Sequence, residues 1–381
     1  MTPANEAELS DALRSANGPV SIRGGGTRGV KTDGMPLSVS AMSGITLYEP
    51  GALTLVAQAG TPVMEVEEAL AKEGQRLAFE PMDHRTLLGT KGTPTLGGIV
   101  AGNVSGPRRI QGGAARDYTL GVRLVDGAGT IIKNGGRVMK NVTGYDLVKL
   151  MTGAYGTLGV LTEVALKVLP VPETQATLML RALSDADAVR AMAVAMSSPY
   201  EVSGAAHCAR ISKDGPVTLL RLEGFEDSVN YRLAALRTLL KDHVKDMHVA
   251  DGEASAWMWE SVRDASLMSQ DIGDIWRVAC KASDAAVLAD KSGAEAWYFD
   301  WAGGLIWFRT RPGFDLRNAL GPFDGHATLV RATKISGQAP LPRFHPEAAG
   351  VARLSAGLRA RFDPKGILNP GLMGPVAPET V

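Results

Sequence analysis

Cysteine is scarce in this sequence: only Cys208 and Cys280 occur among 381 residues, and they lie far apart. An iron–sulfur cluster or a structural zinc site usually needs several closely spaced cysteines, so this chain cannot supply either by itself. Two isolated cysteines are typical of reduced core thiols in a cytosolic protein.

Clustered histidines are also lacking. The six histidines are scattered singly, with no H-x-H or H-x-x-E grouping, so we expect no bound metal. The G-x-S-x-G, H-E-x-x-H and P-loop lysine motifs are missing as well. These absences exclude the common signatures of serine hydrolases, zinc proteases and P-loop NTPases.

There is no excess of charge of either sign and no long apolar run. Lys plus Arg equals Asp plus Glu at 40 each, which argues against nucleic-acid binding. No apolar segment approaches the ~18 residues of a membrane span, and residues 1–13 are acidic and helix-like, unlike a secretory signal. We therefore expect a cytoplasmic protein whose partners are small molecules or proteins.

Glycine, by contrast, is abundant, with 44 residues concentrated before residue 160. A short apolar strand runs into Arg23, Gly24, Gly25, Gly26 and Thr27. Because glycine has no Cβ and reaches positive φ freely, such a run lets several backbone N–H groups turn toward one anion. The spacing also fits G-x-G-x-x-G, but no amphipathic helix follows, which disfavours a Rossmann site. A flavin or other phosphate loop and a plain glycine-rich turn both remain open.

A second stretch, residues 95–106, consists almost entirely of small or apolar residues. Thr95 is a suitable cap for a helix whose first turn contains Gly97 and Gly98, which favours a second anion site. The alternative is a small-residue helix packed tightly on a strand. The following Arg108 and Arg109 are expected to be solvated charge by default, with electrostatic support of the site as the alternative.

The order of elements predicts an α+β protein. Residues 1–172 contain short strands, two amphipathic helices and a hairpin at 119–133, and they end in an alternating strand closed by Pro170 and Pro172. Residues 173–338 carry fewer glycines, more charge and alternating strand and helix units, which indicates a mixed α+β cap. Residues 339–381 contain a helix at 346–362 and a tail.

The ordered set of motifs resembles the vanillyl-alcohol-oxidase / p-cresol-methylhydroxylase class of FAD-binding domains. The motifs are the triple-glycine loop, Thr-Leu-Gly-Gly at 95–98 and Gly-Thr-Leu-Gly-Val-Leu-Thr-Glu-Val at 156–164. The resemblance is closer still to the FAD-binding E subunits of glycolate oxidases, through the segments at 106–109, 115–118, 138–146 and 325–329. It implies a two-subdomain flavin domain, a cap, and a tail that returns to the flavin domain.

The resemblance also implies the cofactor and its residues. FAD would be held non-covalently, because Thr27 stands where covalent members of the class carry a flavin-linking histidine. The implied FAD-binding residues are Arg23, Gly24, Gly25, Gly26, Thr27, Thr95, Gly97, Gly98, Ala101, Asn103, Asp117, Val160 and Asn369. The implied partners are a catalytic FAD subunit and an iron–sulfur subunit acting on a 2-hydroxy acid, with peripheral membrane association possible through them.

Two readings of the function remain. In the first, the chain is a flavin-carrying subunit of a 2-hydroxy-acid dehydrogenase, because neither a histidine cluster nor an onward electron path is visible in it. In the second, it is a self-sufficient flavin oxidase with its own substrate pocket. His326 is then the best candidate for the catalytic base, although the sequence favours a structural histidine on a strand over a catalytic one, because no acid partner is visible.

Overall fold

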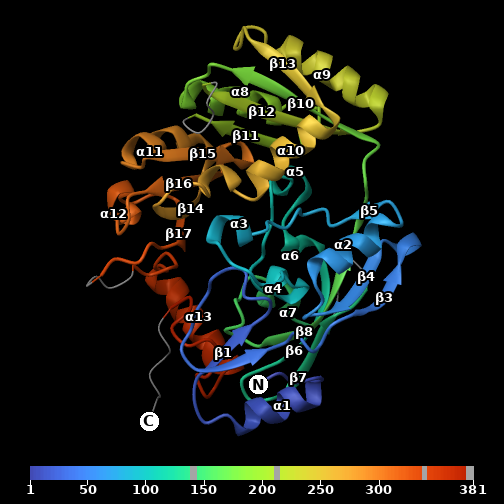
Figure 1. Cartoon of the computed structure of the whole chain (residues 1–381), viewed down its shortest axis with the longest axis vertical. Coiled ribbons are helices and arrows are strands. Elements are labelled where there is room, and N and C mark those ends of the chain that lie inside the picture. The colour runs from blue at the N-terminus through green and yellow to red at the C-terminus, as the bar shows by residue number, and fades with distance from the viewer. Residues whose placement is uncertain (138–143, 210–214, 337–340, 375–381) are drawn as a thin grey trace.

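The computed structural model describes residues 1–137, 144–209, 215–336 and 341–374, which build two large antiparallel sheets (Figure 1). The motif residues 138–143 therefore lie outside the described part of the chain. The first sheet has five strands, listed in spatial order: β3 (Ile45–Glu49), β4 (Thr54–Gln58), β8 (Val160–Lys167), β6 (Thr119–Val125) and β7 (Ile131–Gly135).

Short helices and a parallel strand pair accompany this sheet. The parallel pair, which the sequence pattern did not predict, joins β1 (Val20–Arg23) to β2 (Met35–Ser38). The helices are α1 (Glu6–Ser15), α2 (Val63–Ala71), α3 (Arg85–Leu88), α4 (Leu96–Ala101), α5 (Arg109–Gly112), α6 (Ala115–Tyr118) and α7 (Leu147–Met151). A further two-stranded pair joins β5 (Gln75–Arg76) to β9 (Leu169–Pro170).

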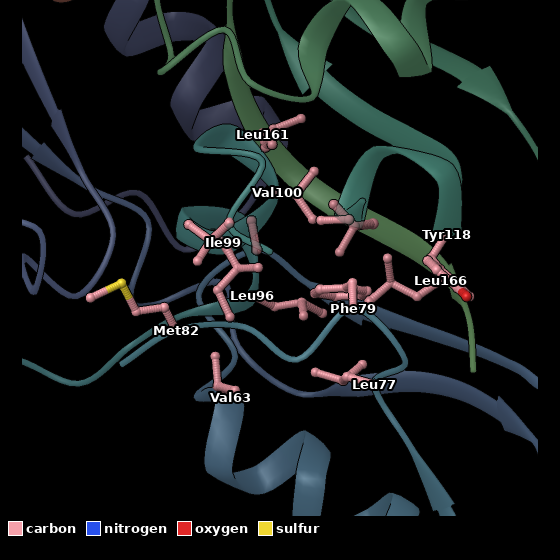
Figure 2. Close-up of a cluster of buried hydrophobic side chains, with 14 of the residues drawn as sticks. Val63, Leu77, Phe79, Met82, Leu96, Ile99, Val100, Tyr118, Leu161 and Leu166 are labelled. Carbon is pink, nitrogen blue, oxygen red and sulfur yellow. The ribbon is translucent and has the colours of Figure 1, made fainter. Parts of the chain in front are cut away.

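A buried apolar cluster fixes α4 on the five-stranded sheet (Figure 2). Ile99 and Val100 of α4 lie near Leu161 of β8, and Phe79 is fully buried beside the ring of Tyr118 at 6.0 Å. Burying an aliphatic or aromatic side chain of this size contributes roughly 1.5–3 kcal/mol. This packing therefore fixes the position of the glycine-rich start of α4 relative to the sheet.

The second sheet has eight strands and consists of two repeats of the same β-α-β-β-α-β motif. The first repeat comprises β10 (Thr174–Arg181), α8 (Asp185–Met196), β11 (Gly204–Cys208), β12 (Val217–Gly224), α9 (Glu226–Leu240) and β13 (Met247–Asp251). The second comprises β14 (Asp274–Cys280), α11 (Ala285–Lys291), β15 (Ala296–Asp300), β16 (Leu305–Thr310), α12 (Leu316–Leu320) and β17 (Gly325–Arg331). In both, the spatial order is fourth, first, third, second strand, and the halves meet where β11 pairs with β15.

The two faces of this sheet have different coverings. The side chains that pack with α8, α9, α11 and α12 alternate along each strand with side chains that point the other way, as strand geometry requires. On that other face α10 (Gly252–Arg263) covers the first repeat, where Trp259 Nε1 donates a hydrogen bond to Thr177 of β10 at 2.8 Å. Figure 1 shows α10 between the sheet and the five-stranded part of the molecule.

A buried ion network joins the two parts of the chain. The Arg221 guanidinium on β12 donates to both carboxylate oxygens of Glu80 at 2.9 Å, and Arg108 pairs with Glu80 at 2.9 Å and with Glu223 at 2.5 Å. Arg108 is 6% exposed, so it is not solvated charge. The structure assigns it to electrostatic support between the two sheets.

The C-terminal segment runs back to β1. After α13 (Ala349–Phe362), the backbone N–H of Val20 donates to the carbonyl oxygen of Ile367 at 2.7 Å, and that of Asn369 donates to the Val20 carbonyl at 3.0 Å. The predicted return of the tail is therefore confirmed, and the tail lies beside the strand that leads into the triple glycine.

Candidate functional site

The triple-glycine loop packs closely against the segment around residues 92–95. A Cβ on Gly25 would lie 1.5 Å from the carbonyl oxygen of Thr93, and one on Gly24 would lie 2.4 Å from Thr95 Oγ1. Of the three glycines, Gly26 has the positive φ, at 70°. Two of the glycines are thus needed for close backbone packing and one for the turn, a division that the sequence alone did not reveal.

The start of α4 has both the predicted cap and the tight packing that the alternative interpretation expected. Thr95 Oγ1 accepts a hydrogen bond from the N–H of Gly98 at 3.3 Å and caps the helix as predicted. A Cβ on Gly97 would lie 2.6 Å from that of Ala59, so this glycine allows tight packing on the chain after β4. Gly98 faces open space between the helix and the triple-glycine loop.

Three cavities that share lining residues form one long groove along these elements. A cavity of about 80 Å³ lies at the triple-glycine loop, one of about 70 Å³ lies by Val160, and one of about 400 Å³ lies toward the eight-stranded sheet. Arg28 lines all three. This row of three adjoining cavities, called the groove below, extends from β8 to the second repeat of the sheet.

Most of the predicted site residues line this groove. At the triple-glycine cavity are Arg23, Gly24, Gly25, Gly26, Thr27, Thr95 and Gly98. At the cavity by β8 are Gly97, Ala101, Val160 and Asn369, together with Gly24 and Gly98. At the large cavity are Asn103 and His326.

Asp117 is the exception, because it lines none of the three cavities. Its Oδ2 accepts a hydrogen bond from the N–H of Ala114 at 2.8 Å and so caps the short helix α6. Its negative charge acts on the nearby Arg109, whose pKa it raises against the larger lowering effect of burial. Asp117 is thus a neighbour of the groove and not part of its wall.

Asn369 connects three segments at the β8 end of the groove. Its Oδ1 accepts from the N–H of Ile22 at 2.8 Å, and its Nδ2 donates to the Tyr155 carbonyl at 2.8 Å. Both Asn369 and Tyr155 have positive φ, at 44° and 53°. Non-glycine residues rarely adopt this conformation, and they do so most often at functional sites.

Sequence reasoning missed Arg28 and Tyr155. The Arg28 guanidinium lies over the Tyr155 ring at 5.0 Å, and its Nη1 is buried without a hydrogen-bond partner. Burial lowers the pKa of Arg28. The available signals were the position of Arg28 directly after the glycine loop and the Gly-Ala-Tyr-Gly segment at 153–156, but neither pattern by itself specifies a contact.

One face of the second repeat forms the wall of the large cavity. The register places Arg277 of β14 opposite Trp307 of β16 and Thr328 of β17, and Ala279 opposite Leu305 and His326. All of these side chains line the cavity, as the period of two along a strand predicts. The opposite wall is residues 102–106 of the segment that follows α4.

The large cavity is rich in positive charge. Its lining includes six arginines, which are Arg28, Arg109, Arg116, Arg263, Arg277 and Arg343, and one acidic residue, Asp300. Burial lowers the pKa of Arg277 to about 10. Burial also raises the pKa of Asp300 to about 7, even though its carboxylate accepts a hydrogen bond from the N–H of Trp301 at 2.7 Å.

His326 stands at the exposed rim of this cavity. Partial burial, and then the positive charges of Arg277, His345 and Arg109, lower its pKa below the usual value. A lowered pKa keeps the imidazole neutral at neutral pH, which is the form that accepts a proton. The sequence could not show the arginines beside it, because they come from distant segments.

Comparison with known proteins agrees with this geometry. The "FAD binding domain" family matches residues 1–135. The chain is 35% identical over 360 residues to the glycolate oxidase subunit GlcE of Escherichia coli (strain K12), which covers 93% of this chain and 92% of that protein. It is 33% identical over 187 residues to the glycolate oxidase subunit GlcD of Bacillus subtilis (strain 168), covering 47% of this chain and 38% of GlcD.

Solved structures share the fold at low sequence identity. An alkyldihydroxyacetonephosphate synthase superposes with a TM-score of 0.68 at 17% identity, over 97% of this chain and 76% of that one. The 4-ethylphenol oxidase from Gulosibacter chungangensis gives a TM-score of 0.68 at 12% identity, over 100% of this chain and 89% of that one. The predicted α+β fold class is thereby confirmed.

Fold and family match together define an FAD-linked oxidoreductase with a flavin-binding part of the p-cresol-methylhydroxylase type. Within that class, the chain belongs to the GlcE family of glycolate oxidase subunits. Among the described residues, no helix is long and apolar enough to cross a membrane.

Proposed function

We propose that FAD lies non-covalently along the three-cavity groove. The loop of Arg23, Gly24, Gly25, Gly26 and Thr27 would hold the pyrophosphate, and the cavity at Val160 would take the adenosine end. The flavin ring would lie in the large cavity, beside residues 102–106. The observation that carries this assignment is that Arg28, with its unpartnered buried nitrogen, lines all three adjoining cavities.

The first prediction concerns the attachment of the flavin. The purified chain should be yellow, and acid precipitation should release all of the colour into the supernatant, because Thr27 offers no nucleophilic ring nitrogen for a covalent link. Absorbance of pellet and supernatant near the flavin band measures this. Colour retained in the pellet would contradict non-covalent binding, and a colourless protein that binds no added FAD would contradict the cofactor site.

At the level of the complex, the chain is proposed to be the FAD-binding subunit of a 2-hydroxy-acid dehydrogenase that oxidises glycolate. It would work beside a catalytic FAD subunit and an iron–sulfur subunit. The match to GlcE over nearly the whole of both chains supports this role. The two cysteines, Cys208 and Cys280, lie on different strands and do not provide a cluster site, so onward electron transfer would need another chain.

A second candidate, a self-sufficient oxidase, is favoured by one observation: His326 and several arginines share the large cavity. A base and a carboxylate anchor are what hydride removal from a 2-hydroxy acid requires. FAD would supply the hydride acceptor, while His326 would take the hydroxyl proton. In the complex, the same groups would face a flavin that need not turn over.

Anaerobic mixing of the FAD-loaded chain with excess glycolate separates the two candidates. The subunit role predicts little bleaching of the flavin band by the chain alone and bleaching when the partner chains are added. Rapid bleaching by the lone chain, abolished in His326→Ala, would instead establish the self-sufficient oxidase. General base assistance typically accounts for 10²–10⁴-fold in rate, so the difference is measurable by stopped flow.

A further inference from the structure

The chain contains a buried and a half-buried pair of arginines, and the two pairs differ in how their charge is compensated. Arg108 and Arg221 are ion-paired with Glu80 and Glu223 at the junction of the two sheets. Arg109 and Arg277, in the large cavity, make no ion pair and no side-chain hydrogen bond with any residue that the structure describes. Asp117 acts on Arg109, and Asp300 acts on Arg277, only from beyond ion-pair distance.

An aromatic ring holds the second pair in place. The guanidiniums of Arg109 and Arg277 lie over the indole of Trp301, at 4.6 and 4.9 Å from the ring centroid. Trp301 is itself fixed, because its Nε1 donates to the Gly106 carbonyl at 3.0 Å. A guanidinium held by an aromatic face keeps its five N–H donors available, unlike one that is forked onto a carboxylate.

Partly withdrawing two cations from water without an ion pair is unfavourable, so such an arrangement points to an anion that comes from outside the chain. Arg109 comes from α5 and Arg277 from β14, so two distant segments of the chain bring a guanidinium to the same cavity and the same indole ring. Arg28 lies at the junction with the triple-glycine loop and is better placed for the cofactor. The planar fork of the arginine side chain matches a carboxylate.

The neighbours of Arg277 add polar groups that carry no charge of their own at neutral pH. The register places the Thr328 hydroxyl opposite Arg277, and His326 opposite Ala279, whose small side chain leaves room. A neutral imidazole and a hydroxyl suit an oxygen on the carbon next to a carboxylate.

We propose that this chain itself binds a small 2-hydroxy or 2-oxo acid, with Arg109 and Arg277 on its carboxylate and with His326 and Thr328 beside the neighbouring oxygen. The site deepens the function proposed above and rests on it, since the flavin would border the same cavity. The GlcE-type chain would then bind anions of the same chemical class as the substrate, whether or not its own flavin reacts.

The test is calorimetric titration of the FAD-loaded chain with glyoxylate, acetate and inorganic phosphate. Glyoxylate should bind more tightly than phosphate, and up to about tenfold more tightly than acetate, because acetate has the same carboxylate but lacks the second oxygen that His326 and Thr328 would contact. Arg277→Gln and Arg109→Gln should each weaken glyoxylate about tenfold or more. His326→Ala should reduce the ratio between the affinities for glyoxylate and for acetate.

Arg116→Gln is the matched control, because Arg116 lines the same cavity from an exposed position. This variant should bind glyoxylate within about twofold of wild type if Arg109 and Arg277 act by direct contact and not through the overall positive charge of the cavity. Equal loss in Arg116→Gln, stronger binding of phosphate, or no binding to FAD-loaded wild type would overturn the proposal. The flavin absorbance of each variant reports separately on the cofactor site, so loss of FAD would not be confused with loss of the anion.

Discussion

Gly25 has room for a hydrogen atom where any other residue places a carbon. A Cβ there would lie 1.5 Å from the Thr93 carbonyl oxygen, so Gly25→Ala must displace the segment that faces the loop. We expect the variant to bind FAD at least about tenfold more weakly while most of the fold persists, since the contact is local. Flavin fluorescence on reconstitution of the apoprotein measures this.

Gly18→Ala is the control for that variant, because a Cβ at Gly18 meets nothing within 4 Å and its φ is not positive. It should bind FAD as wild type does. Circular dichroism establishes that both variants are folded. Wild-type affinity in a folded Gly25→Ala protein would show that the loop does not hold the cofactor.

Asp300 is predicted to make stability fall as pH rises. Burial raises its folded-state pKa to about 7 from an ordinary value of 3.8, so the folded chain holds a proton that the unfolded chain releases between these values. In that window the folded state binds more protons, and the free energy of unfolding therefore decreases with increasing pH. Asp300→Asn, which keeps an oxygen for the Trp301 N–H, should remove this contribution.

The measurement is the Tm of the FAD-loaded wild type and of Asp300→Asn between pH 5 and 8. The wild type should lose more Tm over this interval than the variant does. All other titrating groups are common to both proteins, so the difference between the curves isolates Asp300. Parallel curves would show that the carboxyl does not take up a proton in this range.

The contact between the two sheets depends on a few fully paired charges. Burial alone would raise the pKa of Glu80, but Arg221 and Arg108 outweigh burial and hold the pKa below its usual value. Glu80→Gln leaves two buried guanidiniums with less compensation, and breaking such a pair typically costs about 3–5 kcal/mol. Urea unfolding of the variant measures the loss.

Arg190→Gln serves as the control, because Arg190 and its partner Asp187 form an exposed ion pair within α8. Removing it should change stability by no more than about 1 kcal/mol. The carboxylates of Glu80 and Glu223 have lowered pKa values, so their stabilisation is present above about pH 4.5 and is lost as pH falls below it. A Glu80→Gln variant as stable as wild type would show that the network is not a structural tie.

The sequence was sufficient for many of the elements and for most of the residues that line the groove, because both are encoded locally. Capping residues, glycine runs and alternating apolar residues mark helices such as α1, turns and strands such as β8. The triple glycine and residues 95–103 then fall on one groove, as their motif resemblance implied. The assignment of these residues to FAD contacts remains a prediction.

The sequence could not predict which distant residues the strand register and the packing bring into contact. Arg277, Trp301 and Arg109 have no shared pattern, since the first two belong to the second repeat and the third to a short helix more than a hundred residues earlier. The repeat itself was missed because the two copies share topology and not sequence. Arg108 gave no sign of burial, because its partner Glu223 lies on a strand of the other sheet.

The position of α10 has a consequence for how this fold can change its chemistry. In the first repeat that helix seals the inner face of the sheet, whereas in the second repeat the same face borders the large cavity. Along β14, Trp276 and Val278 pack in the core while Arg277 and Ala279 face the cavity. Residues that face the cavity and residues that face the core thus alternate along one strand. Substitutions at the first set can change what the cavity binds while the core that stabilises the fold stays the same.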